Sequence, residues 1–272
     1  MSITFGLDNI INKQLNSLLL TQQFLKTKDI NDPKIGSEIW KILTHNNENK
    51  NLIHNIDNLS VNRSWAITLA LKLQRIIVDY QLHQLKLGNT LYTFEILKDV
   101  FTLFFFFAED PHLSVLDIGC GSGYYCDILQ HFFPNLYKYH GCDTQPEIIQ
   151  IAKEYYPFID FRVQDLTNMK YNDKEFDISI FSHGSTNMFK YNEVFEEACR
   201  ITKKYIILHR ICVTNEHACS KRSLHYYLPS ISHSFNNKTI FDIFEKHNFT
   251  LIWEGRCESN AMTFVLKRQE NE

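Results

Sequence analysis

The sequence lacks the features that mark several special classes of protein. Its seven cysteines form no Cys-x-x-Cys pair, and their odd number suits reduced thiols better than a disulfide framework, a zinc site or an iron-sulfur site. No apolar run is long enough to span a bilayer, and the first residues lack the basic start and apolar core of a signal peptide. We therefore expect a cytoplasmic protein with no metal and no membrane partner.

A strong excess of positive charge is also missing. The formal net charge is -3 and no block of Lys and Arg stands out, whereas a protein that binds a phosphate backbone usually presents a basic face. Nucleic acid is therefore not an expected partner, although a local basic groove would be compatible with this total. The 272 residues, 44% hydrophobic and 22% charged, suit one α/β core with an elaboration.

The chain from residue 113 onward alternates short apolar runs with helical stretches, which is typical of a mostly parallel sheet with helices on its faces. The expected strands are 114–118, 139–142, 160–163, 177–181, 205–209, 251–255 and 261–267. No helix separates the last two strands, and because a parallel return needs a long crossover, the last strand must be antiparallel. The sequence thus predicts a seven-stranded, doubly wound, Rossmann-like sheet.

Helices are expected between these strands and before the first of them. Helical stretches occupy 124–133, 145–156, 191–202 and 239–247, and a helix over 90–107 packs on the sheet. Residues before about 88 show helical periodicity on both sides of a polar stretch at 44–60. We predict a helical N-terminal cap over 1–88 and an α/β domain over 89–272.

The segment VLDIGCGSGY leads an apolar strand into a glycine-rich turn and then a helix. Gly119, Gly121 and Gly123 permit positive φ angles and leave no Cβ in the way, while the helix N-terminus offers unpaired amides to a carboxylate. A dinucleotide-binding turn of the form G-x-G-x-x-G needs glycine at the sixth position, where this chain has Tyr124. The spacing is instead D-x-G-x-G-x-G, starting at Asp117. A site for a nicotinamide dinucleotide is therefore less favoured.

With this motif the chain resembles class I S-adenosylmethionine-dependent methyltransferases, in particular the broad group that acts on small molecules. The resemblance extends over about residues 92–267, because acids follow the next two strands at Asp143 and Asp165. It implies S-adenosylmethionine as the cofactor, S-adenosylhomocysteine as the product and a class I methyltransferase domain over 89–272.

The resemblance also implies roles for single residues. Asp143 would bind both ribose hydroxyls, Asp165 would face the adenine amino group, and Asp117 would steady the turn and attract the cofactor's ammonium group. The residues expected to hold the cofactor are Asp117, Gly119, Cys120, Gly121, Asp143, Thr144, Asp165, Leu166 and Ser182. A single Asp after a strand is more often a helix cap or turn former, but three in register favour a cofactor site.

The ends of the fourth and fifth strands supply the candidate catalytic residues. Methyl transfer from a sulfonium is a direct displacement, so the enzyme mainly aligns the reactants and excludes water. His183 would accept a proton from a protonated acceptor or simply pack against the cofactor. His209 and Arg210 point toward the same rim, with a structural role, such as bonding a loop carbonyl, as the alternative.

Several subclasses do not match the segment after the fourth strand. It lacks the Asp/Asn-Pro-Pro-aromatic run of enzymes that methylate amino groups of nucleic acids, and no Pro-Cys pair of the cytosine-C5 kind occurs. Catechol-type enzymes hold magnesium with a carboxylate where this chain has Ser182, so no metal is expected. The aromatic segment 225–235 resembles the lid of many small-molecule enzymes, with a surface loop as the alternative.

The resulting prediction is an S-adenosylmethionine-dependent methyltransferase that moves a methyl group to oxygen or nitrogen of a small metabolite. Two alternatives stay open: a non-catalytic module that binds the cofactor with the same fold, and an enzyme that acts on RNA or protein. Acceptor specificity depends on the cap and the lid, where the sequence is least informative.

Overall fold

The computed structural model describes residues 75, 78–79, 81–107, 112–182, 190–216, 218–225, 228–258 and 261–269. Contacts within the chain divide it into two units, residues 1–90 with 222–231 and residues 91–221 with 232–272. Most of the predicted helical cap over 1–88, and the whole of His183, lie outside the described residues, so both stay predictions.

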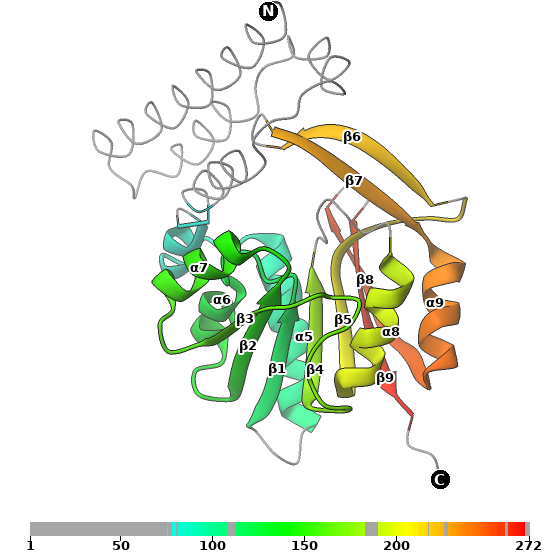
Figure 1. The fold of residues 1–272 in the computed structure, drawn as a ribbon. Coiled ribbons are helices and arrows are strands. Elements are labelled where there is room, and N and C mark those ends of the chain that lie inside the picture. Colours follow the sequence, from blue (N-terminus) through cyan, green and yellow to red (C-terminus); the bar gives the residue numbers. More distant parts are fainter. Residues whose placement is uncertain are drawn as a thin grey trace, which may run out of the picture. The chain divides into compact units, whose positions relative to one another are not determined.

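The sheet has nine strands among the described residues, in the order β3-β2-β1-β4-β5-β7-β6, with β9 beside β5 and β8 beside β9 (Figure 1). The strands are β1 (Leu113–Ile118), β2 (Tyr137–Asp143), β3 (Asp160–Val163), β4 (Phe176–Ser182), β5 (Thr202–Thr214), β6 (Cys219–His225), β7 (Leu228–Asn236), β8 (Phe249–Glu258) and β9 (Ala261–Arg268). Strands β1 to β5 pair in parallel, whereas β9 is antiparallel to both β5 and β8. The predicted Rossmann-like sheet with an antiparallel last strand is confirmed.

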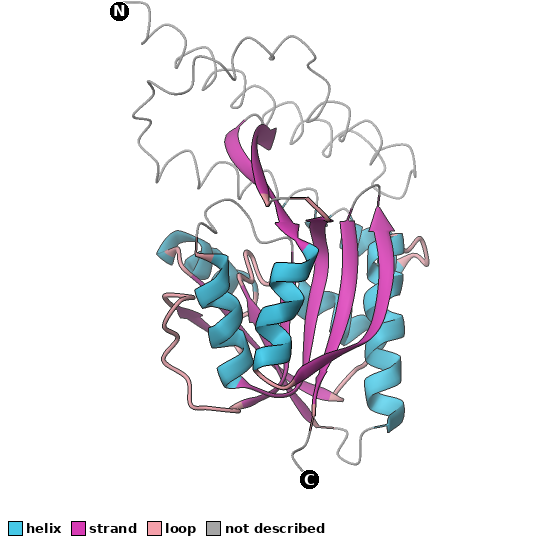
Figure 2. Cartoon of the chain, turned by 90° about the vertical axis from the view of Figure 1, so that its right-hand side faces the viewer, coloured by secondary structure: helices cyan, strands magenta, loops and turns pink. Residues whose placement is uncertain are grey.

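Helices lie on both sides of the central strands (Figure 2). They are α5 (Tyr92–Phe107), α6 (Tyr125–Phe132), α7 (Pro146–Tyr155), α8 (Tyr191–Ile201) and α9 (Asn237–Lys246). Successive side chains of a strand point to opposite faces of the sheet, so the side chains of β5 contact helices on both faces. Leu208 shares a buried cluster with Phe195 of α8, while Tyr205 stacks on Phe104 of α5 with 4.3 Å between ring centroids. No helix in the described ranges is long and apolar enough to cross a membrane.

Two strands exceed the predicted seven: β7 occupies most of the segment 225–235 that was expected to be a lid or loop, and β6 precedes that segment. The last residues of β5 extend past the end of β4 and pair in parallel with β7, with Cys212 opposite Ser234. The sequence of β7 alternates Ser with Ile, His and Phe, a period of two that is typical of a strand.

Candidate active site

The glycine turn that links β1 to α6 has a backbone that only glycine adopts readily. Gly119, Gly121 and Gly123 have positive φ angles of 74°, 54° and 78°. The amides of Gly119 and Cys120 both donate to the carbonyl oxygen of Cys142, over 2.8 and 3.0 Å. The turn is therefore fastened to the end of β2.

The space around the three glycines separates a ligand-binding role from a packing role. A Cβ added at Gly119 or at Gly121 would meet no atom within 4 Å. At Gly123 the added Cβ would lie 2.5 Å from Cζ of Phe161. The first two glycines border open space, whereas the third is required by the packing of β3 beneath the turn.

Asp117, the acid of the motif, is fully buried near the end of β1. Its Oδ2 accepts a hydrogen bond from the Tyr139 hydroxyl on β2 over 2.5 Å, and its Oδ1 has no hydrogen-bond partner among the described residues. Burial raises the pKa of Asp117 to about 7; the Tyr139 bond opposes this rise and the negative charge of Asp143 adds to it. A buried carboxylate of this kind needs a cation or a further donor to be stable as an anion.

Asp143, the last residue of β2, is bonded directly to the glycine turn. Its Oδ2 accepts from the amide of Gly121 over 3.2 Å, and its Oδ1 accepts from the amide of Gln145 over 3.3 Å. Thr144, which is exposed, places its hydroxyl 3.5 Å from the same Oδ1. Burial raises the pKa of Asp143, while these amide bonds oppose the rise. The structure thus brings together Asp143, Thr144 and the turn.

Asp165 follows β3 at an exposed position. Its Oδ1 accepts from the amide of Thr167 over 2.9 Å and from the Thr167 hydroxyl over 2.8 Å, and these bonds lower the pKa of Asp165. Leu166 is partly buried against the main core. The amide of Gln164 donates to the carbonyl of Asp143 over 2.9 Å, which holds the end of β3 beside the end of β2. The Asp165 carboxylate thus stabilises the turn that follows β3, and its contact with the adenine of the cofactor stays a prediction.

The end of β4 and the adjacent part of β5 form the other half of the candidate site. Because β5 continues to Thr214, His209 and Arg210 lie within this strand and not at its end, as had been predicted. Ser182 ends β4 opposite His209 of β5. The pairing of β5 with β9 shifts register between Leu208 and Ile211, so His209 and Arg210 form a bulge, and Arg210 has a φ of 56°. Bulges often re-aim a side chain near an active site, and a left-handed Arg is strained unless its surroundings hold it.

Arg210 reaches back to the residue that follows the glycine turn. Burial raises the pKa of Tyr124, while the positive charge of Arg210 and a hydrogen bond from it oppose the rise. The rings of Tyr124 and Tyr125 are 4.6 Å apart between centroids. Arg210 therefore joins the bulge in β5 to the start of α6.

His209 is fully buried between the sheet and α6. Its Nδ1 lies 2.8 Å from the Thr263 hydroxyl of β9, which in turn lies 2.7 Å from the sulfur of Cys257. The His209 ring also meets the ring of Tyr125 edge-on, 5.8 Å away. These contacts favour the structural alternative, and a catalytic role for His209 stays a prediction.

Cys120 and the start of α6 complete the turn. The Cys120 side chain is buried, and burial raises the pKa of its thiol well above the ordinary value, so it stays protonated at neutral pH. The N-cap of α6, Tyr124, makes no side-chain capping bond. The amides of Cys126 and Asp127 already donate to the carbonyls of Gly123 and Tyr124, both over 3.1 Å, while the positive end of the helix dipole favours a carboxylate here.

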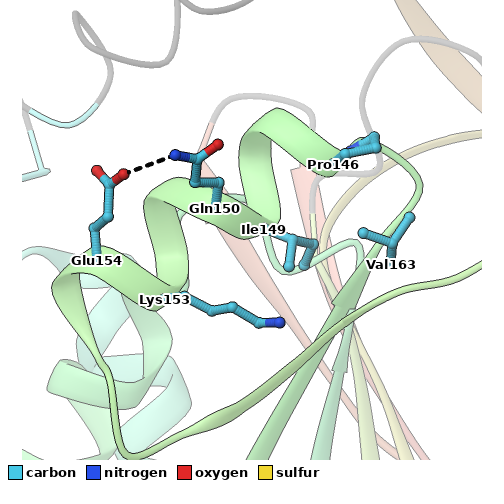
Figure 3. A pocket seen from close by; sticks show the side chains of 6 residues that line it. All are labelled: Pro146, Ile149, Gln150, Lys153, Glu154 and Val163. Carbon is cyan, nitrogen blue, oxygen red and sulfur yellow. Dashed lines mark hydrogen bonds between the residues drawn. The ribbon is translucent and has the colours of Figure 1, made fainter.

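A separate pocket of about 400 Å³ lies between α7 and the end of β3 (Figure 3). It is lined by Pro146, Ile149, Gln150, Lys153, Glu154 and Val163. None of these is a predicted cofactor residue. Gln150 donates to Glu154 over 3.1 Å along the exposed face of α7. Within the described part of the chain, no three His, Cys, Asp or Glu residues are grouped so that they could hold a metal.

Tyr139 was not among the predicted site residues. Its position carried a usable signal, because Tyr139, Gly141 and Asp143 alternate along β2 and so share one face. Gly141 lies directly opposite Asp117 in the parallel pairing of β1 with β2. A tyrosine two residues before this glycine can therefore reach the acid of the motif.

The sheet order and the glycine turn define a Rossmann-like protein, a fold whose ligands bind outside the carboxyl ends of the strands. Residues 109–261, more than half of the chain, match the model of the methyltransferase domain family. The chain belongs to this family, which confirms the expected resemblance.

Curated relatives are similar over part of their length. The ubiquinone/menaquinone biosynthesis C-methyltransferase UbiE of Campylobacter jejuni is 27% identical over 129 residues, which are 44% of this chain and 55% of that protein. A demethylmenaquinone methyltransferase of Paenarthrobacter aurescens is 36% identical over 62 residues, 23% of this chain and 24% of that protein. The chain spans about half the length, or less, of these relatives.

Solved structures with a similar backbone fold include two methyltransferases. A SAM-dependent methyltransferase of Methanosarcina mazei has a TM-score of 0.49 at 16% identity, covering 61% of this chain and 96% of that one. The magnesium protoporphyrin IX methyltransferase of Synechocystis, solved with bound SAH, has a TM-score of 0.46 at 14% identity, covering 65% and 84%.

Proposed function

We propose that this chain is an S-adenosylmethionine-dependent methyltransferase that acts on a small molecule. The observation that carries the proposal is the open space at Gly119 and Gly121 together with the buried, unpartnered Oδ1 of Asp117 two residues earlier. An amino acid group fits these features, because its ammonium would pair with Asp117 and its carboxylate would lie near the positive N-terminal end of α6.

The remaining cofactor contacts follow along the same edge of the sheet. Asp143 supplies two carboxylate oxygens at the end of β2, which suit two neighbouring ribose hydroxyls. Asp165 and Leu166 at the end of β3 would border the adenine. When bound, S-adenosylmethionine supplies a methyl group already activated by its sulfonium. The chain's own task is then to align the acceptor with that methyl group and to exclude water.

The acceptor would lie at the end of β4 and the bulge in β5, beside Ser182 and Arg210. Arg210 is a permanent cation that the bulge holds in one backbone conformation, so it would favour an acceptor that carries or develops negative charge. Two similar proteins are named for methyl transfer in quinone biosynthesis, one of them to carbon. Carbon therefore joins oxygen and nitrogen as a proposed acceptor atom.

Calorimetry on the whole chain tests the cofactor part of this proposal. Both S-adenosylmethionine and S-adenosylhomocysteine should bind with one site per chain. If a folded preparation binds neither, the enzyme proposal and the non-catalytic binding module both fail.

Turnover assays then separate the remaining alternatives. Formation of S-adenosylhomocysteine should depend on a small acceptor, with a demethylated naphthoquinol and simple phenols as first probes. Turnover with RNA or protein alone would favour a macromolecular acceptor. Cofactor binding without turnover on any of these would favour the non-catalytic module.

A further inference from the structure

Tyr139 places its hydroxyl against the acid of the glycine motif. The side chain is buried in β2, and its hydroxyl donates to Oδ2 of Asp117 over 2.5 Å. Burial raises the pKa of Tyr139 well above the ordinary value, and the negative charge of Asp117 raises it further. The phenol therefore stays protonated near neutral pH and remains the donor of this bond.

The second oxygen of Asp117 has no such partner. Asp117 is fully buried, and Oδ1 accepts no hydrogen bond from any residue that the structure describes. The titratable groups whose charges are coupled to it are Tyr139, Cys142 and Asp143 from β2 and Cys120 and Tyr124 from the turn. None of these five is a cation. Burying this carboxylate without a positive partner is unfavourable, so its unpartnered oxygen suits a cationic ligand.

We propose that Tyr139 is a positioning residue for the cofactor's amino acid group: by holding Oδ2 of Asp117, it keeps Oδ1 directed at the bound ammonium. This inference rests on the proposed cofactor site. It adds a residue that lies outside the glycine motif. A role in core packing alone would not require a hydroxyl group at this position. A Phe at the same place would fill the space but leave both carboxylate oxygens without a donor.

Tyr139→Phe tests the proposal, with Tyr137→Phe as the matched control. Tyr137 lies on the same strand and donates to the carbonyl of Cys126 over 3.1 Å, away from Asp117. Calorimetry at pH 7 should show S-adenosylhomocysteine binding to Y139F about tenfold more weakly than to the wild type, as expected for loss of a bond to a charged group. Y137F should bind it as the wild type does.

A second probe separates positioning from a general structural role. The nucleoside 5′-methylthioadenosine lacks the amino acid group, so its affinity should be the same for Y139F and the wild type. Equal weakening of both probes, or no weakening of S-adenosylhomocysteine, overturns the proposal. Failure of the wild type to bind S-adenosylhomocysteine overturns the proposed function itself, whereas normal wild-type binding with an unaffected Y139F overturns only the role of Tyr139.

The wild type provides a further test if Y139F does not fold. Only the ionised carboxylate of Asp117 can pair with the ammonium. Because burial raises the pKa of Asp117 to about 7, the negative charge of this carboxylate forms as the pH rises through that value. Affinity for S-adenosylhomocysteine should increase between pH 5.5 and 7.5, by up to about tenfold per pH unit, while that for 5′-methylthioadenosine stays flat. Identical pH profiles for the two probes contradict the proposal.

Discussion

The two halves of the carboxyl edge of the sheet offer different groups to a ligand. At β1 and β2 the backbone dominates: positive φ angles open a space, and turn amides are bonded to Cys142 and Asp143. Asp117 is buried there, and its Oδ1 has no hydrogen-bond partner in the described part of the chain. At β4 and β5 a register shift leaves one charged side chain, Arg210, in a left-handed conformation. The first half suits a cofactor that many proteins share. The second half depends on one side chain, as expected where an acceptor is selected.

Asp117→Asn should produce the largest change in stability. In the folded chain, burial raises the pKa of Asp117 from 3.8 to about 7. Between pH 3.8 and pH 7 the Asp117 carboxyl loses its proton in the unfolded chain but keeps it in the folded chain. The free energy of unfolding of the wild type therefore falls as the pH rises through this range. The variant should lack this loss and, without cofactor, be more stable at pH 8 by up to about 4 kcal/mol, with no gain at pH 4.

Chemical denaturation of both proteins at the two pH values measures this difference. Asp160→Asn is a suitable control, because Asp160 is paired with Arg162 on the partly exposed β3. Equal stability of D117N and the wild type at pH 8 would show that Asp117 is not held as a buried acid.

Gly119→Val should remove cofactor binding with a smaller effect on the fold. The added side chain would enter open space that the cofactor needs, and its positive φ would be strained. Affinity for S-adenosylhomocysteine should fall about a hundredfold or more, with a stability loss of about 1–2 kcal/mol. Gly88→Val is the matched control, since Gly88 also has a positive φ and no atom within 4 Å of an added Cβ. Unchanged affinity in G119V would place the cofactor elsewhere.

Asp143→Ala should weaken cofactor binding by a smaller factor than Gly119→Val does. The variant loses acceptors for the ribose hydroxyls and also the bond from the Gly121 amide. Calorimetry should show S-adenosylhomocysteine binding at least about tenfold more weakly, since each hydrogen bond to a charged group contributes roughly 1.5–3 kcal/mol. Asp160→Ala serves as the control at the neighbouring strand. An affinity equal to that of the wild type would contradict the assignment of Asp143.

The same contrast explains what could be predicted from the sequence. The succession of strands and helices along the chain and the glycine turn follow from local patterns, because apolar runs and glycine spacing report backbone geometry directly. Tyr139 was missed because its importance arises from a contact with β1, 22 residues earlier in the chain. The bulge at Arg210 was missed because it depends on the register of β5 against β9, which no local pattern fixes. Contacts between distant segments determine these features.

Arg210→Gln should have the smallest effect on cofactor binding and thereby separate the two halves. If Arg210 serves the acceptor, affinity for S-adenosylhomocysteine should stay within about twofold of the wild type while turnover with an anionic acceptor falls about tenfold. Arg256→Gln, at an exposed position of β8, is the control. Arg210→Gly should be about 1 kcal/mol more stable than Arg210→Gln, because glycine accepts the left-handed backbone without strain. If Arg210→Gln instead weakens the cofactor as much as Asp143→Ala does, Arg210 acts through Tyr124 on the turn, and the two halves form one site.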